Sequence, residues 1–181
     1  HIVPKEKRNY TIHTREQYEQ LKFSNLTYKA VFDTLFYTGM RLGECLALTL
    51  ADIDLENKSI AINKNISQRK VVTKPKTPNS IRKVIIPGFL VDELRDYINA
   101  RYGLTPSDTL FKANRTPLRN EFRRALAEQD LPIIRMHDLR HSHASMMIEL
   151  GCNILLVAER LGDTPGTALA TYSHLYPNKQ E

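Results

Sequence analysis

Residues 136–143 read Met-His-Asp-Leu-Arg-His-Ser-His and place a histidine and an arginine one helical turn apart. Because side chains at positions i and i+3 share a helix face, His137 and Arg140 can reach the same ligand. The imidazole can exchange a proton near neutral pH, and the guanidinium offers a planar cationic fork, so a phosphate diester suits the pair. An isolated His-x-x-Arg motif is more often a helix cap beside a solvated charge, so this interpretation needs support from the rest of the chain.

The residues that follow predict that the motif opens a helix. Apolar side chains recur at helical spacing from Leu139 to Leu150, and Gly151 is a typical C-terminal cap. On this pattern His143 faces the core and is structural. His137 precedes the apolar face and remains available to a ligand.

The chain carries a formal net charge of +6 with a pI near 9.3, which favours a polyanionic partner. Its basic residues are also clustered. The first cluster contains no acidic residue and consists of Lys64, Arg69, Lys70, Lys74, Lys76, Arg82 and Lys83. The second is interrupted only by Glu121 and consists of Lys112, Arg115, Arg119, Arg123 and Arg124. Together with the His-Arg pair, these clusters favour nucleic acid as the partner over a merely solvated surface.

The length of 181 residues and the hydrophobic content of 41% predict one domain with its own core. No apolar run approaches a membrane span, and residues 1–5 lack the apolar segment of a signal peptide, so we expect a soluble, cytoplasmic protein. Cys45 and Cys152 lie far apart within apolar helical patterns, which favours buried thiols over a disulfide or a metal site.

The order of the patterns predicts a mainly helical chain with a small antiparallel sheet. Residues 1–13 show no apolar period and are interpreted as a linker remnant, with the domain proper spanning 14–181. A capping box at residues 14–17 opens a short helix, and a nearly all-apolar helix at about 27–38 ends at Gly39. Alternating β-branched residues between 54 and 86 predict strands, and helical patterns return from residue 87 onward.

Two further positions carry charge at special places in this order. Arg41 stands at a helix entrance, where it can meet an anion with help from the helix dipole or pair with Glu44 at i+3, and the sequence leaves both interpretations open. The loop at residues 74–80 contains two prolines, which remove backbone donors, so it lies outside a central strand. It projects Lys74 and Lys76 outward.

One ordered set of motifs runs through the whole chain. It comprises Thr38–Glu44, Lys76 on a β-hairpin, His137–His141, Leu161-Gly162 and Tyr172-Ser173-His174. This set resembles the catalytic domain of the tyrosine recombinases, and most of all the phage and conjugative-transposon integrases. Each motif is weak alone, but a tyrosine 32 residues after Arg140 (172 − 140) is specific. The resemblance spans Thr14 to Asn178.

The resemblance implies an α+β fold, mainly α-helical with a small antiparallel three-stranded sheet, and a site-specific DNA recombinase. In such an enzyme Tyr172 attacks a DNA phosphodiester to form a 3′-phosphotyrosyl link, and Arg41 and Arg140 clamp the phosphate oxygens. Lys76 resembles the general acid, with Lys74 as the alternative assignment, and His137 assists proton transfer. Neither metal nor cofactor is expected, in agreement with the absence of metal-ligand spacings and phosphate-binding loops from the sequence.

The resemblance also assigns supporting roles and partners. Glu44 and His141 support the site, and the expected partner is double-stranded DNA. The basic residues assigned to DNA contact are Lys64, Arg69, Lys70, Lys74, Arg115, Arg119 and Arg123. The full-length protein is expected to act as a homotetramer, and this chain to be a monomeric fragment without the N-terminal DNA-binding domains. The alternatives are a DNA-binding protein with an impaired site, or a relaxing enzyme similar to type IB topoisomerases.

One position in the candidate site departs from the family pattern. After Leu161-Gly162 the family usually has histidine, sometimes tryptophan, whereas this chain has Asp163. A carboxylate about 4 Å from a phosphate charge costs roughly 4 kcal/mol at an effective dielectric constant of 20. Three interpretations are open: Asp163 points away and orients Arg140 or His137, it is a lesion, or His174 compensates for it.

Overall fold

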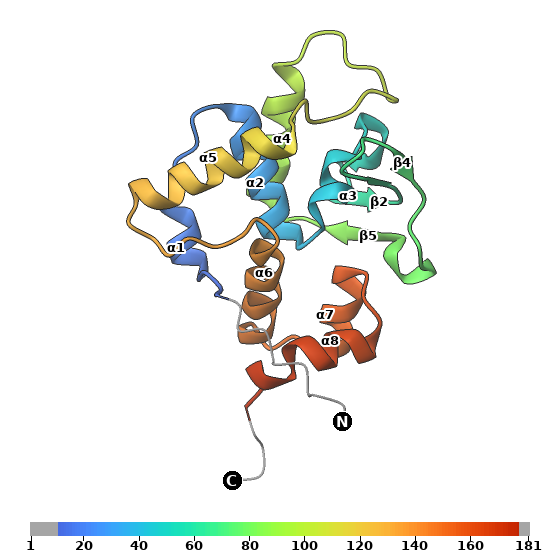
Figure 1. Cartoon of the computed structure of the whole chain (residues 1–181). Coiled ribbons are helices and arrows are strands. Elements are labelled where there is room, and N and C mark those ends of the chain that lie inside the picture. Colours follow the sequence, from blue (N-terminus) through green and yellow to red (C-terminus); the bar gives the residue numbers. More distant parts are fainter. Residues whose placement is uncertain (1–10, 178–181) are drawn as a thin grey trace.

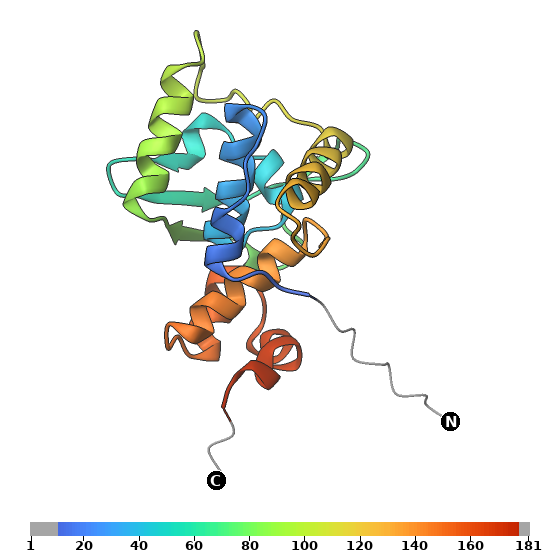
Figure 2. The same cartoon turned by 90° about the vertical axis from the view of Figure 1, so that its left-hand side faces the viewer.

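Helix α2 (Leu26–Thr38) is the element on which the others pack in the computed structural model, which describes residues 11–177. Every residue from Ala30 to Thr38 is buried, as the all-apolar pattern predicted. The Asn25 side chain caps the first turn, and Gly39 ends the helix in the left-handed conformation, with φ of 71°. Figure 2 shows α4 and α5 on opposite sides of α2.

The chain is mainly helical, as predicted, and its remaining elements are short. The other helices are α1 (Arg15–Glu19), α3 (Leu42–Leu46), α4 (Gly88–Asn99), α5 (Arg115–Glu128), α6 (Asp138–Glu149), α7 (Ile154–Leu161) and α8 (Pro165–Tyr172), with 3-10 turns η1 (Leu50–Asp52), η2 (Pro78–Ser80) and η3 (Ser173–Leu175) (Figure 1). In both views α7 and α8 lie together at one end of the molecule, beside α6 (Figure 1, Figure 2). Among the described residues, no helix is long and apolar enough to cross a membrane.

The predicted three-stranded antiparallel sheet is confirmed. Its order is β1-β2-β5, with β1 (Ile53–Asp54), β2 (Ser59–Ile62) and β5 (Arg82–Ile85). A separate pair joins β3 (Asn65–Ile66) to β4 (Val72–Thr73). The expectation that Lys76 lies on a β-hairpin was therefore wrong: its loop joins β4 to β5, which pair with different strands. Two prolines in the loop lack the amide donors that a hairpin ladder requires.

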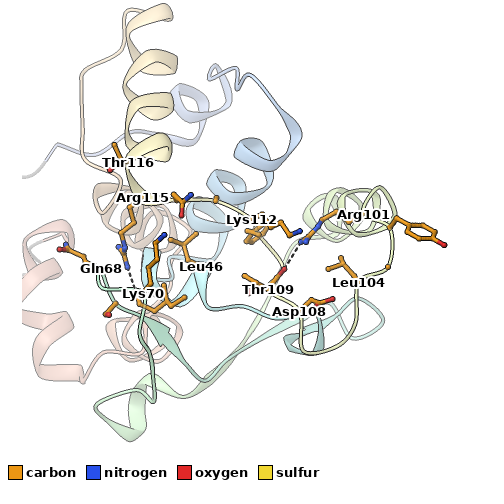
Figure 3. Close-up of a pocket in the computed structure, with 17 residues that line it drawn as sticks. Leu46, Gln68, Lys70, Arg101, Leu104, Asp108, Thr109, Lys112, Arg115 and Thr116 are labelled. Carbon is orange, nitrogen blue, oxygen red and sulfur yellow. Dashed lines mark hydrogen bonds between the residues drawn. The ribbon is translucent and has the colours of Figure 1, made fainter.

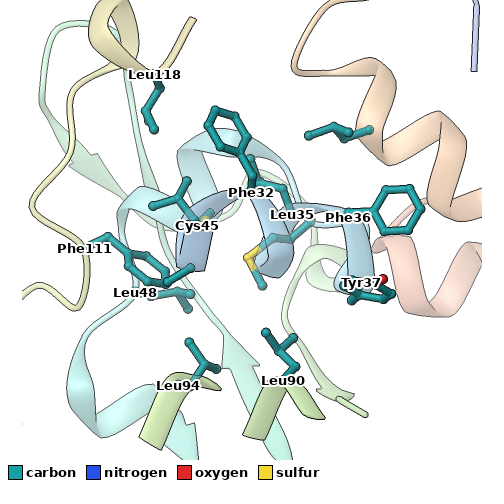
Figure 4. Close-up of a cluster of buried hydrophobic side chains, with 14 of the residues drawn as sticks. Phe32, Leu35, Phe36, Tyr37, Cys45, Leu48, Leu90, Leu94, Phe111 and Leu118 are labelled. Carbon is teal, nitrogen blue, oxygen red and sulfur yellow. The ribbon is translucent and has the colours of Figure 1, made fainter. Parts of the chain in front are cut away.

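The main core lies between α2, the sheet and α4. Phe32 and Phe36 of α2 are fully buried, and Leu90 and Leu94 of α4 close the opposite side (Figure 4). The Phe32 ring stacks on Phe122 of α5, with ring centroids 5.1 Å apart. Burial of side chains of this size contributes about 2 kcal/mol each, so this cluster supplies most of the fold's driving force.

The two cysteine predictions had different outcomes. Cys45 is free and fully buried in the core, and burial raises the pKa of its thiol, as expected for a structural residue. Cys152 is only half-buried and lies outside any helix. Gly151 ends α6 with φ of 89°, and Asn153 caps α7, so Cys152 falls in the short turn between two helices.

The N-terminal boundary also involves packing. His13, assigned to the linker by its sequence, is buried: its amide donates to Ser142 Oγ at 2.9 Å, and its Nε2 lies 3.0 Å from the Pro132 carbonyl oxygen. At least this residue of the predicted linker therefore packs against the domain. Residues 1–10 of that linker lie outside the described part of the chain.

A buried histidine fastens α6 and α7 to the end of α2. His143 Nδ1 lies 2.7 Å from the Phe36 carbonyl oxygen, and Arg160 Nε donates to His143 Nε2 at 2.9 Å. Arg160 also donates to the carbonyl oxygens of Tyr37 and Ile85. Burial, and then the nearby Arg160 charge, lower the pKa of His143 to about 3, so the ring is neutral and accepts from Arg160. The predicted structural role of His143 is confirmed.

Replacing Gly39 by alanine should destabilise the domain by on the order of 3 kcal/mol. About 1 kcal/mol or more comes from the left-handed backbone, and the rest from overpacking, because a Cβ would lie 2.6 Å from His143 and 2.7 Å from Leu161. Gly103→Ala is the matched control, since Gly103 has φ of 74° but no neighbouring atom within 4 Å. Urea unfolding measures both, and equal losses would contradict the packing argument.

His143→Gln should flatten the acid limb of the stability curve. The folded pKa of His143 lies below its ordinary 6.5, so the unfolded state binds the extra proton. The stability due to the neutral ring is present above pH 6.5 and is lost as pH falls toward 3, at up to about 1.4 kcal/mol per pH unit. Glutamine stays neutral throughout. Denaturant unfolding between pH 7 and pH 4 tests this, and an unchanged slope in the variant would disprove it.

Candidate active site

Glu44, three residues along the chain, holds Arg41 in place at the start of α3. The Arg41 backbone amide donates to Glu44 Oε1 at 3.0 Å, and its guanidinium Nη1 lies 3.4 Å from the same oxygen. The pairing that the sequence left open is therefore present. Arg41 nevertheless keeps a second guanidinium nitrogen for another anion: Nη2 donates to Asp163 Oδ1 at 2.8 Å. Its side chain is 39% exposed, so a ligand can reach it.

Glu44 is a buried anion shared by two arginines. Its second oxygen accepts from Arg82 Nη1 at 2.5 Å, and both of these side chains are only 5% exposed. Arg82 also donates from Nε to the Arg160 carbonyl oxygen at 2.8 Å. From its sequence, Arg82 was predicted only to be one charge in a basic cluster. It lies two residues before the buried Val84 on β5, and side chains at i and i+2 of a strand point to the same face, so this spacing is the signal for an inward position.

Arg140 lies on α6 with a side chain only 4% exposed. Its Nη1 donates to the Gly39 carbonyl oxygen at 2.8 Å. Its Nη2 forms an ion pair with Asp163 Oδ2 at 3.1 Å, in a geometry that is not that of a hydrogen bond. Burial, and then the charge of Arg41, lower the pKa of Arg140 to about 10. The guanidinium is still charged at neutral pH, and its need for an anion is strong.

Asp163 lies between the two arginines. It follows Gly162, which ends α7 with φ of 72°, and its largely buried carboxylate, 13% exposed, directs one oxygen to Arg41 and the other to Arg140. The interpretation that Asp163 orients Arg140 agrees with this geometry, but the expectation that it points away from the phosphate-binding position was wrong, because its carboxylate lies between the two arginines. Within residues 11–177 its described contacts are with the arginines and not with His137.

Tyr172 is the last residue of α8 and is almost completely buried. Its hydroxyl lies 2.8 Å from His141 Nδ1, and the two rings meet edge to face. Burial, and then the nearby His137, lower the pKa of His141 to about 4, so its ring is neutral and can accept the phenol proton in a hydrogen bond. Tyr172 is also close enough to Arg140 to influence the pKa of that arginine.

His137 occupies the N-cap position of α6 without a capping hydrogen bond from its side chain, and it is exposed. Its ring meets that of His141 edge to face, with centroids 5.0 Å apart. Partial loss of hydration, and then the charge of Arg140, lower the pKa of His137. The ring is therefore mainly neutral at pH 7, and either nitrogen can take part in proton exchange.

The two lysines of the β4–β5 loop face the same site. Lys74 and Lys76 are exposed and line a cleft of about 450 Å³ together with Arg41 and Asp163. The structure therefore brings both lysines to a cleft that Arg41 also lines. The choice of Lys76 over Lys74 remains a prediction.

A basic groove leads away from Arg41. It has a volume of about 1080 Å³, and its lining includes His137, Arg115, Arg119, Arg123 and Arg135. A second cleft of about 880 Å³ shares Arg115 with the groove. Figure 3 shows Lys70 and Arg115 at one end of it and Arg101 at the other. Most of the predicted DNA contacts thus form one continuous surface.

Two predicted DNA-contact residues are placed differently. Lys64 is bonded to Asp52, which neutralises its charge, and also donates to Asn63. Arg69 is exposed in the β3–β4 loop. Arg135, which was not predicted from the sequence as a DNA contact, forms an ion pair with Asp138 at 2.9 Å and lines the basic groove.

Within residues 11–177, no three His, Cys, Asp or Glu side chains gather where they could hold a metal ion.

The combination of fold, arginine pair and C-terminal tyrosine defines the class of this protein. Residues 11–179 match the model of the phage integrase family, and the chain belongs to that family.

Two comparisons with sequences of named proteins place it further. It is 38% identical to the ICEBs1 integrase of Bacillus subtilis over 173 residues, covering 86% of this chain and 47% of that protein. It is 28% identical to the XerC-like tyrosine recombinase of Caldanaerobacter subterraneus, covering 84% and 46%. The chain thus spans about half the length of the curated relatives it matches.

Solved structures share the fold. The Tn1549 transposon integrase in complex with transposon right end DNA superposes with a TM-score of 0.81 at 18% identity, covering 99% of this chain and 65% of that one. The catalytic domain of the bacteriophage HP1 integrase gives a TM-score of 0.67 at 20% identity, covering 94% and 91%. The predicted α+β fold with its three-stranded sheet is confirmed by this likeness.

Proposed function

We propose that this chain is the catalytic domain of a site-specific DNA recombinase that integrates or excises a mobile element. The observation that carries the proposal is the convergence of Arg41 and Arg140, distant in sequence, on one anion. The Tyr172 hydroxyl lies 2.8 Å from Nδ1 of His141, the residue after Arg140. Such a pair of cationic forks suits the two non-bridging oxygens of a phosphodiester. Membership of the phage integrase family supports the same reaction.

In the proposed cleavage step, the Tyr172 oxygen attacks phosphorus as its proton passes to the neutral His141 ring, and the bond to the 5′ oxygen breaks. The DNA 3′ phosphate becomes esterified to the tyrosine, and Lys76 (or Lys74) protonates the departing 5′ oxygen. Arg41 and Arg140 stabilise the charge that builds on phosphorus, where one preorganised donor contributes on the order of 3 kcal/mol. A 5′ hydroxyl from a partner strand reverses the reaction and rejoins the DNA, and the ester conserves the bond energy.

The histidines prepare the nucleophile. Neutral His141 accepts the Tyr172 hydrogen bond and fixes the direction of the phenol oxygen. His137 stands at the mouth of the basic groove, where it can contact the phosphate and exchange a proton. Glu44 holds Arg41 in place from behind. Each residue therefore has a task that its environment allows.

We further propose that double-stranded DNA lies along the basic groove and that the full-length protein acts as a homotetramer, with this chain alone monomeric. The expected compartment is the cytoplasm.

A second candidate function, DNA binding with an impaired site, is favoured by one observation: the Asp163 carboxylate occupies the space between the arginines. The relaxing-enzyme alternative shares the same cleavage chemistry.

Tyr172→Phe should abolish a covalent protein–DNA adduct that the unchanged chain forms with a nicked suicide duplex. Phenylalanine keeps the buried ring but lacks the nucleophilic oxygen. Tyr176→Phe is the matched control, because its hydroxyl donates to the Cys152 carbonyl oxygen at 2.9 Å and has no proposed chemical role. Denaturing electrophoresis detects the adduct. No adduct from the unchanged chain, despite DNA binding in a mobility-shift assay, would favour the impaired binder.

Salt should weaken DNA binding steeply, and Arg119→Ala should reduce the slope of log K against log salt by about 1, the value of one phosphate contact. Arg119 is exposed and lines the basic groove. Arg95→Ala is the control, because Arg95 lies on α4 and pairs with Asp92 at 3.0 Å. Fluorescence anisotropy across a salt series measures both. Equal slopes for the two variants would place the DNA elsewhere.

A further inference from the structure

We propose that Asp163 is a displaceable internal counter-ion that occupies the place of the scissile phosphate until DNA arrives. Its carboxylate holds Arg41 and Arg140 in position in the DNA-free domain and exchanges with the phosphate on binding. Asp163 is thus a positioning residue whose effect is carried by the two arginines. This inference rests on the proposed function, since it takes the phosphate of the DNA as the incoming ligand.

The first support is the geometry of the carboxylate. Its two oxygens go to different arginines, Oδ1 to Arg41 Nη2 at 2.8 Å and Oδ2 to Arg140 Nη2 at 3.1 Å. A carboxylate and a phosphate both present two acceptor oxygens to guanidinium groups. One anion therefore spans the pair as the two oxygens of a phosphodiester would.

The second support is the need of Arg140 for an anion. Its guanidinium is nearly buried, and in the part of the chain that the structure describes Asp163 is the carboxylate paired with it. Arg41 and Arg82 instead share Glu44. An empty clamp with a neutral residue at position 163 would leave two neighbouring cations without this anion. A histidine there could donate to a bound phosphate but could not neutralise the empty clamp.

The third support is that Asp163 is held less tightly than Glu44. Both carboxylates border the same cleft, but Glu44 accepts from the Arg41 backbone amide and from the buried Arg82, and its side chain is only 5% exposed, against 13% for Asp163. Asp163 lies in the short turn between α7 and α8 and borders the 450 Å³ cleft that Lys74 and Lys76 also line. A change of side-chain rotamer would carry its carboxylate into that cleft, toward these two cations.

The test is the affinity of the 181-residue chain for inorganic phosphate, measured by calorimetry at low ionic strength. If the carboxylate occupies the clamp in about nine of ten molecules, the apparent affinity is reduced about tenfold, and Asp163→Asn should restore it. Asp163→Glu keeps the charge and should bind phosphate nearly as weakly as the unchanged chain. Equal affinity of the asparagine variant and the unchanged chain would overturn the proposal.

Asp33→Asn is the matched control, because it also removes one buried carboxylate charge. Asp33 accepts from Tyr18 and Lys29, away from the arginine pair, so this change should leave phosphate affinity as it is. Because Asp163→Asn can also change the stability of the domain, a second experiment measures the shift in Tm that phosphate causes in each variant. Phosphate should raise the Tm of Asp163→Asn more than that of Asp33→Asn, and equal shifts would show a purely structural role.

The outcome is separable from that of the proposed function. Tighter phosphate binding by Asp163→Asn without any Tyr172 adduct in the unchanged chain would support the counter-ion exchange and count against the recombinase. A Tyr172 adduct with unchanged phosphate affinity would reject the exchange and keep the recombinase.

Discussion

The burial of the Arg140 guanidinium is the constraint on which the rest of the site depends. A cation with so little exposed surface requires both hydrogen-bond acceptors and an opposite charge, because the protein interior screens charge poorly. The Gly39 carbonyl oxygen supplies one acceptor, and the Asp163 carboxylate supplies the charge. The end of α2, the start of α3 and the α7–α8 turn must therefore all meet α6 at this point.

The need of Arg140 for an opposite charge is met within a longer row of side chains whose charges alternate in sign. Arg82, Glu44, Arg41, Asp163 and Arg140 form a chain of ion pairs in which each carboxylate lies between two guanidinium groups. Removing an inner partner of such a pair leaves a buried charge uncompensated, which typically costs 3–5 kcal/mol. A strongly basic protein thus concentrates carboxylates where its arginines are least hydrated. By contrast, the exposed Arg119 and Arg123 line the basic groove, where a polyanion can reach them.

Much of this arrangement could be predicted from the sequence because it depends on local pattern. Apolar spacing located α2 and α6, Gly39 and Gly151 marked helix ends, and the chain order of Arg41, Arg140 and Tyr172 indicated the family. The contacts of Asp163 could not be predicted, because the contact with Arg41 joins residues 122 positions apart and both contacts depend on how the helices pack. Lys76 was placed on a hairpin because strand periodicity does not reveal which strands pair. The burial of Arg82 was missed because one inward arginine is hidden within a run of exposed ones.

The apolar side chains around Tyr172 form a cluster of their own. Ala144, Ile148, Val157, Ala158, Leu161 and Ala168 pack with the tyrosine apart from the main core between α2 and the sheet. The proposed nucleophile is therefore carried by a small core of its own. Arg160 joins this core to the main one, because it donates to the carbonyl oxygens of Tyr37 and Ile85. The position of the tyrosine thus depends on how α7 and α8 pack on α6, and not on the side chains packed between α2 and the sheet.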